Sequence, residues 1–290
     1  MKLYCIINPQ AGRGITAKLW PMIEKNLQKL MVQLEFVFTQ YPGQAKDLAQ
    51  AAIENDYNGV IAIGGDGTIN EVINGLVGSQ IPLGIVPTGT GNDLSKSLRI
   101  PQDPLEAIIV IAKGNKLEIN LGEINGTYFA NVASVGFDAA VANWVNKNKI
   151  FKGKAAYYSA IFYNIIKNKH YQLTINLDSH SIEKECTLTA IANGNYYGAG
   201  QMIAPRAVIN DGFFDVVVVS AVSRGEILKT LPDIKEGKHI ANPHVAIYKA
   251  REVTISSKEK HVPIQADGER IVGLPQTFRI SDNKLKVFVP

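Results

Sequence analysis

The first 120 residues alternate short apolar runs with segments whose apolar residues recur at helical spacing. Four of the runs predict strands, at residues 3–7, 34–39, 60–63 and 83–86. Helical spacing follows the first three of them, at residues 16–30, 45–53 and 68–76. Strands that alternate with helices in this way predict an α/β domain with a doubly wound parallel sheet, which binds its ligands at the carboxyl ends of the strands.

After about residue 121 the apolar runs lie closer together and helical spacing becomes rare. The strand candidates there are residues 128–134, 172–177, 187–192, 214–222, 252–255 and 284–289. The best helix candidate is residues 155–166. We therefore expect a nucleotide-binding α/β domain over 1–121 and a β-rich, mainly antiparallel C-terminal domain over 122–290, whose last strand, near 284–290, could return to the first domain.

The stretch Val60–Glu71 passes from an apolar run into a glycine turn and then into a helix. Its three glycines let main-chain N–H groups approach a ligand closely, and a helix that begins near Thr68 presents unpaired donors to a phosphate. The carboxylate of Asp66 would repel a bare anion, so a metal ion between acid and phosphate suits this turn better. A tight strand-to-helix turn capped by Asp66 is the alternative interpretation.

Composition narrows the class of protein. A length of 290 residues favours two domains, and 46% hydrophobic residues with a net charge of +4 are typical of a soluble globular protein without a strong preference for nucleic acid. Cys5 and Cys186 are too few for a disulfide framework, which favours the cytoplasm. No signal peptide and no apolar run of membrane-spanning length is evident, so we expect any membrane contact to be peripheral.

A basic and aromatic segment, Trp144–Lys169, lies within a stretch from Ala139 to Leu177 that contains no Asp or Glu. Its lysines are Lys147, Lys149, Lys152, Lys154, Lys167 and Lys169. Aromatic residues are interleaved with them, at Trp144, Phe151, Tyr157, Tyr158, Phe162 and Tyr163. Such a segment could lie against an anionic membrane surface, whereas a half-buried helix with a solvated lysine face is the alternative.

Two familiar phosphate-binding motifs are missing from the sequence. The loop after the first strand lacks Gly-x-Gly-x-x-Gly, and no Gly-x-x-x-x-Gly-Lys-Ser/Thr occurs, which disfavours a dinucleotide-binding protein and a Walker-type ATPase. Carboxylates instead recur on glycine-containing loops, namely Asp66, Asp93, Asp211, Asp215, Asp267 and Glu269. Each alone is typical of a surface turn.

Together these motifs resemble those of the bacterial diacylglycerol kinases, in the lipid kinase family that also includes sphingosine and ceramide kinases. The matching segments, in order along nearly the whole chain, are Asn8-Pro9 with Gly12, Gly64–Glu71, Pro87–Asp93, Val135–Asp138, Asn210–Gly212 and Asp267–Glu269. The combination is specific, although Gly-Gly-Asp-Gly alone also occurs in NAD kinases and phosphofructokinase-like enzymes.

The resemblance implies an active site in a cleft between the two domains, with roles for particular residues. ATP contacts are implied for Asn8, Pro9, Gln10, Ala11, Gly12, Thr39, Gly65, Asp66, Gly67, Thr68, Ile69, Asn70, Glu71 and Thr88. Glu269 is implied as the catalytic base, with Asp267 nearby, and Asp66, Asp93 and Asp211 as a network through water to Mg²⁺. In this family the residue at Asp211 also holds a metal together with main-chain carbonyls, here those of Val208 and Phe213, and a second acid often stands where this chain has Asn210.

The expected function is therefore ATP- and Mg²⁺-dependent transfer of the γ-phosphoryl group to a lipid hydroxyl, with diacylglycerol as acceptor and phosphatidic acid as product. An NAD kinase-like enzyme and a catalytically silent nucleotide-binding regulatory protein are the alternatives. The sequence does not distinguish diacylglycerol from other hydroxyl-bearing lipids, and a homodimer is suggested by analogy alone.

Overall fold

The computed structural model describes residues 1–30, 33–147, 154–167 and 169–290, with all side chains in those ranges except 145–147 and 154–158. Residues 148–153 of the basic and aromatic segment thus lie outside the described residues. The chain divides into two compact units, residues 1–121 with 281–290 (unit 1) and residues 122–280 (unit 2). No helix within the described ranges is long and apolar enough to cross a bilayer.

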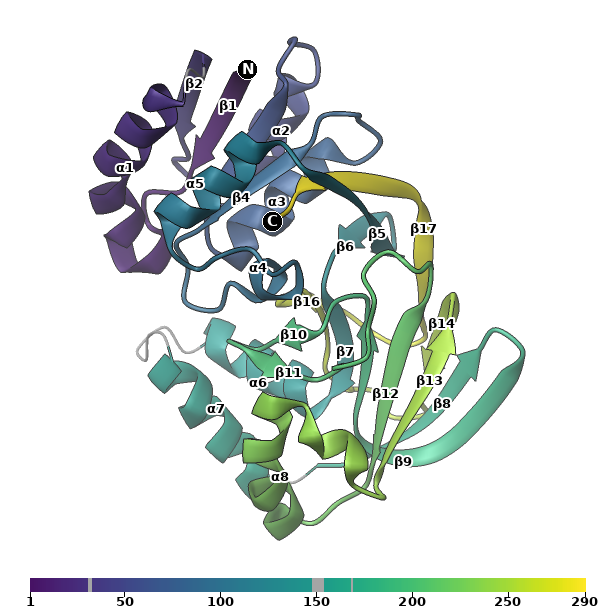
Figure 1. Ribbon diagram of the computed structural model, residues 1–290. Helices are drawn as coiled ribbons and strands as arrows, with labels where there is room; N and C mark the ends of the chain where they lie inside the picture. Colours follow the sequence, from purple (N-terminus) through teal and green to yellow (C-terminus); the bar gives the residue numbers. More distant parts are fainter. Residues whose placement is uncertain (31–32, 148–153, 168) are drawn as a thin grey trace. The chain divides into compact units, whose positions relative to one another are not determined.

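Unit 1 is an α/β unit built on a parallel sheet (Figure 1). Its strands are β1 (Lys2–Ile7), β2 (Gln33–Phe38), β3 (Gly59–Gly64) and β4 (Leu83–Pro87). Its helices are α1 (Ala11–Lys29), α2 (Gln44–Ala52), α3 (Asp66–Leu76), α4 (Asp93–Ser97) and α5 (Pro104–Lys113). The strands are hydrogen-bonded in the order β4-β3-β1-β2, all parallel, so their carboxyl ends share one edge.

Helices α1 and α5 cover one face of this sheet. Trp20, Ile23 and Leu27 of α1 form one core with the alternate strand residues Leu3, Cys5, Ile7, Ile61 and Ile63. Alternate residues of a strand point to opposite faces, and β3 and β4 are buried along their whole length because both of their faces are covered. The apolar runs without polar alternation are therefore buried strands, as the sequence predicted.

Unit 2 is built mainly from antiparallel strands. They are β6 (Thr127–Phe129), β7 (Val132–Gly136), β8 (Tyr171–Leu177), β9 (His180–Ala192), β10 (Tyr196–Tyr197), β11 (Gln201–Met202), β12 (Phe214–Ser220), β13 (Val245–Ala250), β14 (Glu252–Ser256), β15 (Ile264–Ala266) and β16 (Glu269–Ile271). Its helices are α6 (Phe137–Lys147), α7 (Lys154–Lys167), α8 (Arg224–Glu236) and the 3₁₀ helix η1 (Lys238–Ala241). The boundary between the units falls within β5 (Lys116–Ile124) and β17 (Gln276–Phe288).

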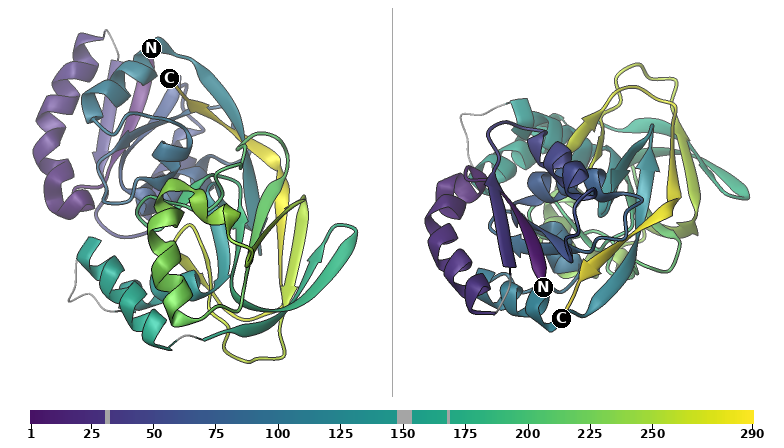
Figure 2. Two further views of the ribbon diagram at one scale, coloured as in Figure 1. Left: turned by 60° about the horizontal axis from the view of Figure 1, so that its bottom comes forward. Right: turned by 90° about the horizontal axis from the view of Figure 1, so that it is seen from above.

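Strand β12 shows how unit 2 is packed. Val216 and Val218 contribute to the core on one side of the sheet, while Val217 contributes to the core on the other. Figure 2 shows β17 leaving this part of the chain and ending among the N-terminal elements, where Val287 pairs in parallel with Leu83 of β4. The predicted fold class, a parallel α/β unit followed by a mainly antiparallel one, is confirmed.

Two local predictions for the second half were wrong. Helices α6 and α8 were missed, and the strand expected at residues 128–134 is divided into β6 and β7. The division has a physical cause, since the N–H groups of residues 130–132 turn away from a ladder and donate to the carboxylate of Asp267. A distant carboxylate of this kind leaves no trace in the local hydrophobic pattern.

Candidate functional site

Three loops meet at the carboxyl edge of the sheet in unit 1: residues 8–14 after β1, 64–68 after β3 and 87–93 after β4. Side chains tie them together, because Asn8 Nδ2 donates to Thr68 Oγ1 at 2.9 Å and the hydroxyls of Thr16 and Thr88 lie 2.6 Å apart. Main-chain bonds add to this, from Asn8 N to Ile63 O and from Thr88 N to Gly64 O. The three loops thus form one preorganised surface.

Glycine is required where the loops touch. A Cβ at Gly89 would lie 2.5 Å from the Cα of Gly65, and a Cβ at Gly12, which has a φ of +58°, would lie 2.2 Å from Thr88 O. At Gly67, in contrast, a Cβ would meet nothing within 4 Å. Two of the glycines thus allow backbones to pack closely, while Gly67 at the start of α3 is open to a ligand.

A cavity of about 210 Å³ opens beside this surface within unit 1. Its walls include several residues that the resemblance implied for ATP, namely Asn8, Gln10, Thr39, Gly67, Thr68 and Glu71. They also include residues that sequence reasoning missed, namely Gln40, Tyr41, Pro42 and Ala45. Tyr41, an aromatic residue three positions after the end of β2, was the available signal for this wall.

Other residues implied for ATP have different positions. Ile69 is 1% exposed and belongs to the core, while Thr88 is buried with its hydroxyl on Thr16. Glu71 uses both carboxylate oxygens to accept the N–H groups of Gly43 and Ala45, at 2.9 and 3.1 Å. Because those residues begin α2, Glu71 fixes the cavity wall that α2 provides.

The carboxylate of Asp66 faces the third loop. Its two oxygens accept the N–H groups of Asn92 and Asp93, at 2.7 and 2.6 Å. Burial raises the pKa of Asp66, while these backbone hydrogen bonds and Lys96 counteract the rise. A carboxylate can accept about four hydrogen bonds. Asp66 also accepts a backbone hydrogen bond from Leu94, and Asp93 lies 3.6 Å from the ammonium of Lys96, so these two carboxylates would hold Mg²⁺ only through water.

The predicted base and its neighbour lie in unit 2, on the hairpin of β15 and β16. Asp267 and Gly268 form its two-residue turn with φ values of +45° and +88°, the geometry that Asp-Gly turns favour. The carboxylate of Asp267 accepts the N–H groups of residues 130–132, so it anchors the hairpin to the start of β7. Glu269 follows the turn and is exposed, which leaves its carboxylate accessible from a rigid support.

The turn around Asp211, implied as a metal site, is also in unit 2. Asp211 Oδ1 accepts the N–H of Phe213 at 3.0 Å, and its Oδ2 lies 2.5 Å from Lys249 Nζ. The same ammonium lies 3.0 Å from Asp215. No three acidic, His or Cys side chains in the described part of the chain are grouped so as to hold a metal. A divalent cation on Asp211 would have to share the carboxylate with Lys249, so these residues do not fit one.

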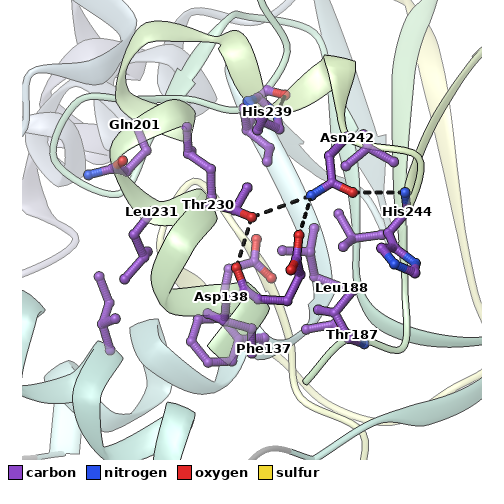
Figure 3. Close-up of a pocket in the computed structure, with 18 of the residues that line it drawn as sticks. Phe137, Asp138, Thr187, Leu188, Gln201, Thr230, Leu231, His239, Asn242 and His244 are labelled. Atoms are coloured by element: carbon purple, nitrogen blue, oxygen red, sulfur yellow. Dashed lines mark hydrogen bonds between the residues drawn. The ribbon is translucent and has the colours of Figure 1, made fainter. Parts of the chain in front are cut away.

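Unit 2 contains a second cavity, of about 60 Å³, with mostly apolar walls (Figure 3). It is lined by α6, α7 and α8 and by strand residues such as Leu188 and Val219. Polar groups at its wall are mostly paired, since Asn242 donates to Glu226 at 2.8 Å and Thr230 donates to Glu226 O at 2.8 Å. The cavity suits an apolar chain better than a polar ligand.

Three residues that line this cavity carry a buried polar atom without a hydrogen-bond partner among the described residues, namely Asp138 (Oδ2), Gln201 (Oε1) and His239 (Nδ1). Burial raises the pKa of Asp138 to about 7, although Ser134 and the N–H of Ala139 favour its ionised form. Burial likewise lowers the pKa of His239, whose Nε2 lies 3.0 Å from Ile203 O. Both groups are therefore held toward their neutral forms.

Helix α7 presents apolar side chains on its outer side. Ala160, Ile161 and Ile165 are buried against α6 and α8, whereas Phe162, Tyr163 and Ile166 are 62%, 40% and 51% exposed. Lys167 and Lys169 are exposed beyond them. This part of the basic and aromatic segment has one buried face and one apolar face in solvent.

Known proteins resemble the chain over its full length. The model of the diacylglycerol kinase catalytic domain matches residues 2–124, and that of the YegS C-terminal NAD kinase beta sandwich-like domain matches residues 131–289. Diacylglycerol kinases from Staphylococcus carnosus and Staphylococcus aureus strain Newman are each 30% identical over 288 residues, which cover 98% of this chain and 94% and 91% of theirs. The crystal structure of a putative diacylglycerol kinase from Bacillus anthracis has a TM-score of 0.84 at 26% identity and covers 100% of this chain and 97% of that one.

The chain therefore belongs to the diacylglycerol kinase family, which confirms the resemblance stated from its motifs. Membership supports a lipid kinase as the class of enzyme.

Proposed function

We propose that the protein transfers the γ-phosphoryl group of ATP to the hydroxyl of a lipid, with diacylglycerol as the acceptor and Mg²⁺ as the accompanying cation. The observation that carries the proposal is the surface of three glycine-containing loops beside the cavity of unit 1. Phosphoryl transfer needs little covalent help, so positioning and charge neutralisation account for most of the catalysis.

In this proposal the nucleotide lies in the cavity of unit 1. Tyr41 and Ala45 offer its base an apolar wall, and Gly67 and Thr68 at the N-terminus of α3 donate N–H groups to its phosphates. Mg²⁺, when bound with ATP, neutralises the charge that develops on the transferring phosphoryl group. Asp66 orders the third loop through the N–H groups of Asn92 and Asp93, and it would hold the metal through water.

Glu269 is the proposed general base, which accepts the proton of the lipid hydroxyl. A positioned base contributes about 10²- to 10⁴-fold in rate, so Glu269→Gln should lower kcat by that factor while ATP binding is retained. Glu252→Gln, at another exposed glutamate of unit 2, is the matched control. Wild-type turnover by Glu269→Gln in a radiolabelled-ATP assay would mean that another group accepts the proton.

The apolar cavity of unit 2 is the proposed site for a chain of the acceptor. Ile227 of α8 lines it and is 8% exposed, so Ile227→Trp should reduce its volume. We expect this variant to phosphorylate a long-chain diacylglycerol poorly and a short-chain one nearly normally. Equal losses with both acceptors would place the acyl chain elsewhere.

Helix α7 is the proposed point of peripheral contact with an anionic membrane at the cytoplasmic face. Phe162 and Ile166 supply exposed apolar area and Lys167 supplies charge. Phe162→Ser with Ile166→Ser should weaken sedimentation with anionic vesicles, whereas Ile109→Ser, at an equally exposed isoleucine of α5, should not. Unchanged sedimentation of the double variant would count against α7.

An NAD kinase activity is the second candidate, since the C-terminal half matches an NAD kinase-like sandwich. Parallel assays with NAD and with diacylglycerol in mixed micelles separate the two reactions. ATP binding without phosphorylation of either acceptor, or of any lipid in a total extract, would instead favour a catalytically silent regulatory protein.

A further inference from the structure

We propose that the ammonium of Lys249 takes the place of a divalent cation at the turn around Asp211, so that this turn is held in position without a metal. This structural role of the turn is separate from the proposed kinase activity. One lysine, two carboxylates and the main chain of residues 208–213 take part in it.

The sheet fixes where the ammonium lies. Asp215 on β12 is directly opposite Lys249 on β13 in an antiparallel pair, so their side chains emerge on the same face. Asp215 is 2% exposed and lies 3.0 Å from the ammonium. Asp211 reaches the same ammonium from the turn that precedes β12, at 2.5 Å. One cation therefore joins a strand, its neighbour and the turn.

The turn is formed around that contact. Asp211 N donates to Val208 O at 3.2 Å, and Phe213 N donates to Asp211 Oδ1 at 3.0 Å. The carbonyl of Val208 and one carboxylate oxygen, both implied as metal ligands, are thus engaged within the turn. The other oxygen of Asp211 contacts the ammonium of Lys249, as it would contact a metal ion.

The charges in this cluster already balance. The ammonium of Lys249 lies 2.5 Å from Asp211 and 3.0 Å from Asp215, and Arg206 also interacts electrostatically with Asp215. Two carboxylates face one ammonium and one guanidinium, so a divalent cation would add an uncompensated charge at a partly buried place.

Position 210 agrees with this balance. The residue beside Asp211 is the neutral Asn210, and a second carboxylate at that position would leave the cluster short of positive charge. With Asn210 and Lys249 together, the turn needs no metal. Any Mg²⁺ requirement of the reaction then belongs to the nucleotide alone.

The first test uses the purified wild-type chain and reads metal content and thermal unfolding, so that it does not depend on kinase activity. After dialysis we expect less than about 0.1 equivalent of divalent metal, and Tm values in EDTA, Mg²⁺ and Ca²⁺ that agree within about 1 °C. About one equivalent of retained metal would overturn the proposal. A fall of Tm by more than about 2 °C in EDTA would also overturn it.

The second test removes the ammonium. Lys249→Met in EDTA should unfold roughly 4–8 °C below wild type because two carboxylates lose their shared cation, and millimolar Mg²⁺ or Ca²⁺ should restore at least about half of the loss. The added substitution Asp211→Asn should abolish that recovery. Lys249→Arg keeps the charge, and Lys238→Met removes an exposed pair with Glu236, so both should stay within about 2 °C of wild type.

A folded Lys249→Met variant that neither metal stabilises would overturn the proposal, because the ammonium would then not occupy a place that suits a cation. If Lys249→Met does not fold, the metal content and EDTA response of the wild type decide the question by themselves. A failure of the kinase assays would leave these results unchanged.

Discussion

At about pH 8 the carboxyl of Asp138 is an ionised group at the wall of an apolar cavity, and replacing it with asparagine should remove a destabilising charge. Asp138 is 5% exposed, and burial raises the pKa of its carboxyl to about 7, against about 3.9 for an unperturbed aspartate. A pKa raised on folding means that the folded state keeps the proton while the unfolded state releases it. The associated stability is complete below about pH 4 and is lost as the pH rises through about 7.

The size of the effect follows from the pKa difference. Each pKa unit corresponds to about 1.4 kcal/mol, so between about pH 5 and about pH 7 the wild type loses roughly 3 kcal/mol that Asp138→Asn does not lose. Asparagine brings its own cost of about 1–3 kcal/mol if its new amide donor finds no acceptor. That cost is the same at every pH, so it cancels when the variant's stability difference is compared between two pH values.

The assay is thermal unfolding of wild type and Asp138→Asn at about pH 5 and about pH 8. For a unit of this size about 1 kcal/mol corresponds to roughly 2–4 °C, so the difference in Tm should move by about 6–12 °C in favour of the variant at the higher pH. Asp56→Asn, at an exposed aspartate of unit 1, is the control variant. A difference for Asp138→Asn that stays within about 2 °C between the two pH values would refute the reasoning, because the carboxyl would then titrate normally.

Three further variants test the unit 1 site. Gly89→Ala should lower stability by about 1–3 kcal/mol in a thermal melt and weaken ATP binding in calorimetry, because its Cβ would lie 2.5 Å from the Cα of Gly65; unchanged ATP affinity would contradict the close packing of these loops. Asp66→Ala should raise the Mg²⁺ and ATP requirements of the reaction together, and an unaltered Mg²⁺ titration would count against its role. Glu71→Gln should raise the KM for ATP several-fold with little change in kcat, since it weakens the bonds to Gly43 at the start of α2; a loss confined to kcat in steady-state kinetics would argue for a direct chemical role.

The parallel unit could be predicted because its strands are buried on both faces. Runs such as Val60–Ile63 are apolar at every position and do not alternate with polar residues. The glycines and Thr68 that follow predict a turn into a helix. The same loops carry the family motifs, so the meeting of three glycine-containing loops at one edge of the sheet could be predicted from sequence. Helix α3 begins at Asp66, two residues before the expected Thr68, and the carboxylate at this first position accepts the N–H of Asp93 in the third loop.

Other features depend on contacts between residues far apart in sequence. Strand β6 ends where the N–H of Ala130 donates to the carboxylate of Asp267, which is 137 residues away in sequence. The ammonium of Lys249 likewise pairs with Asp211, which is 38 residues away. Neither pair has a local signature. Helix α8 was missed because it carries Pro232 and exposes an apolar side chain at Leu228, which blurs its helical spacing. The cavity of unit 2 is lined mainly by apolar residues that look like core residues in the sequence. They come together around a cavity only through the fold.

The path of β17 has a consequence for how the protein is synthesised. Phe288 is buried in the core of unit 1, where it packs on Gly59, and Val287 pairs with β4. A ribosome that has translated residues 1–121 has therefore not yet supplied every part of that core. We infer that the nascent N-terminal half does not complete its folding until the rest of the chain has emerged. Until then, the apolar surface that Phe288 covers in the finished protein stays exposed. Deletion of residues 285–290 should consequently damage the half of the protein that was made first.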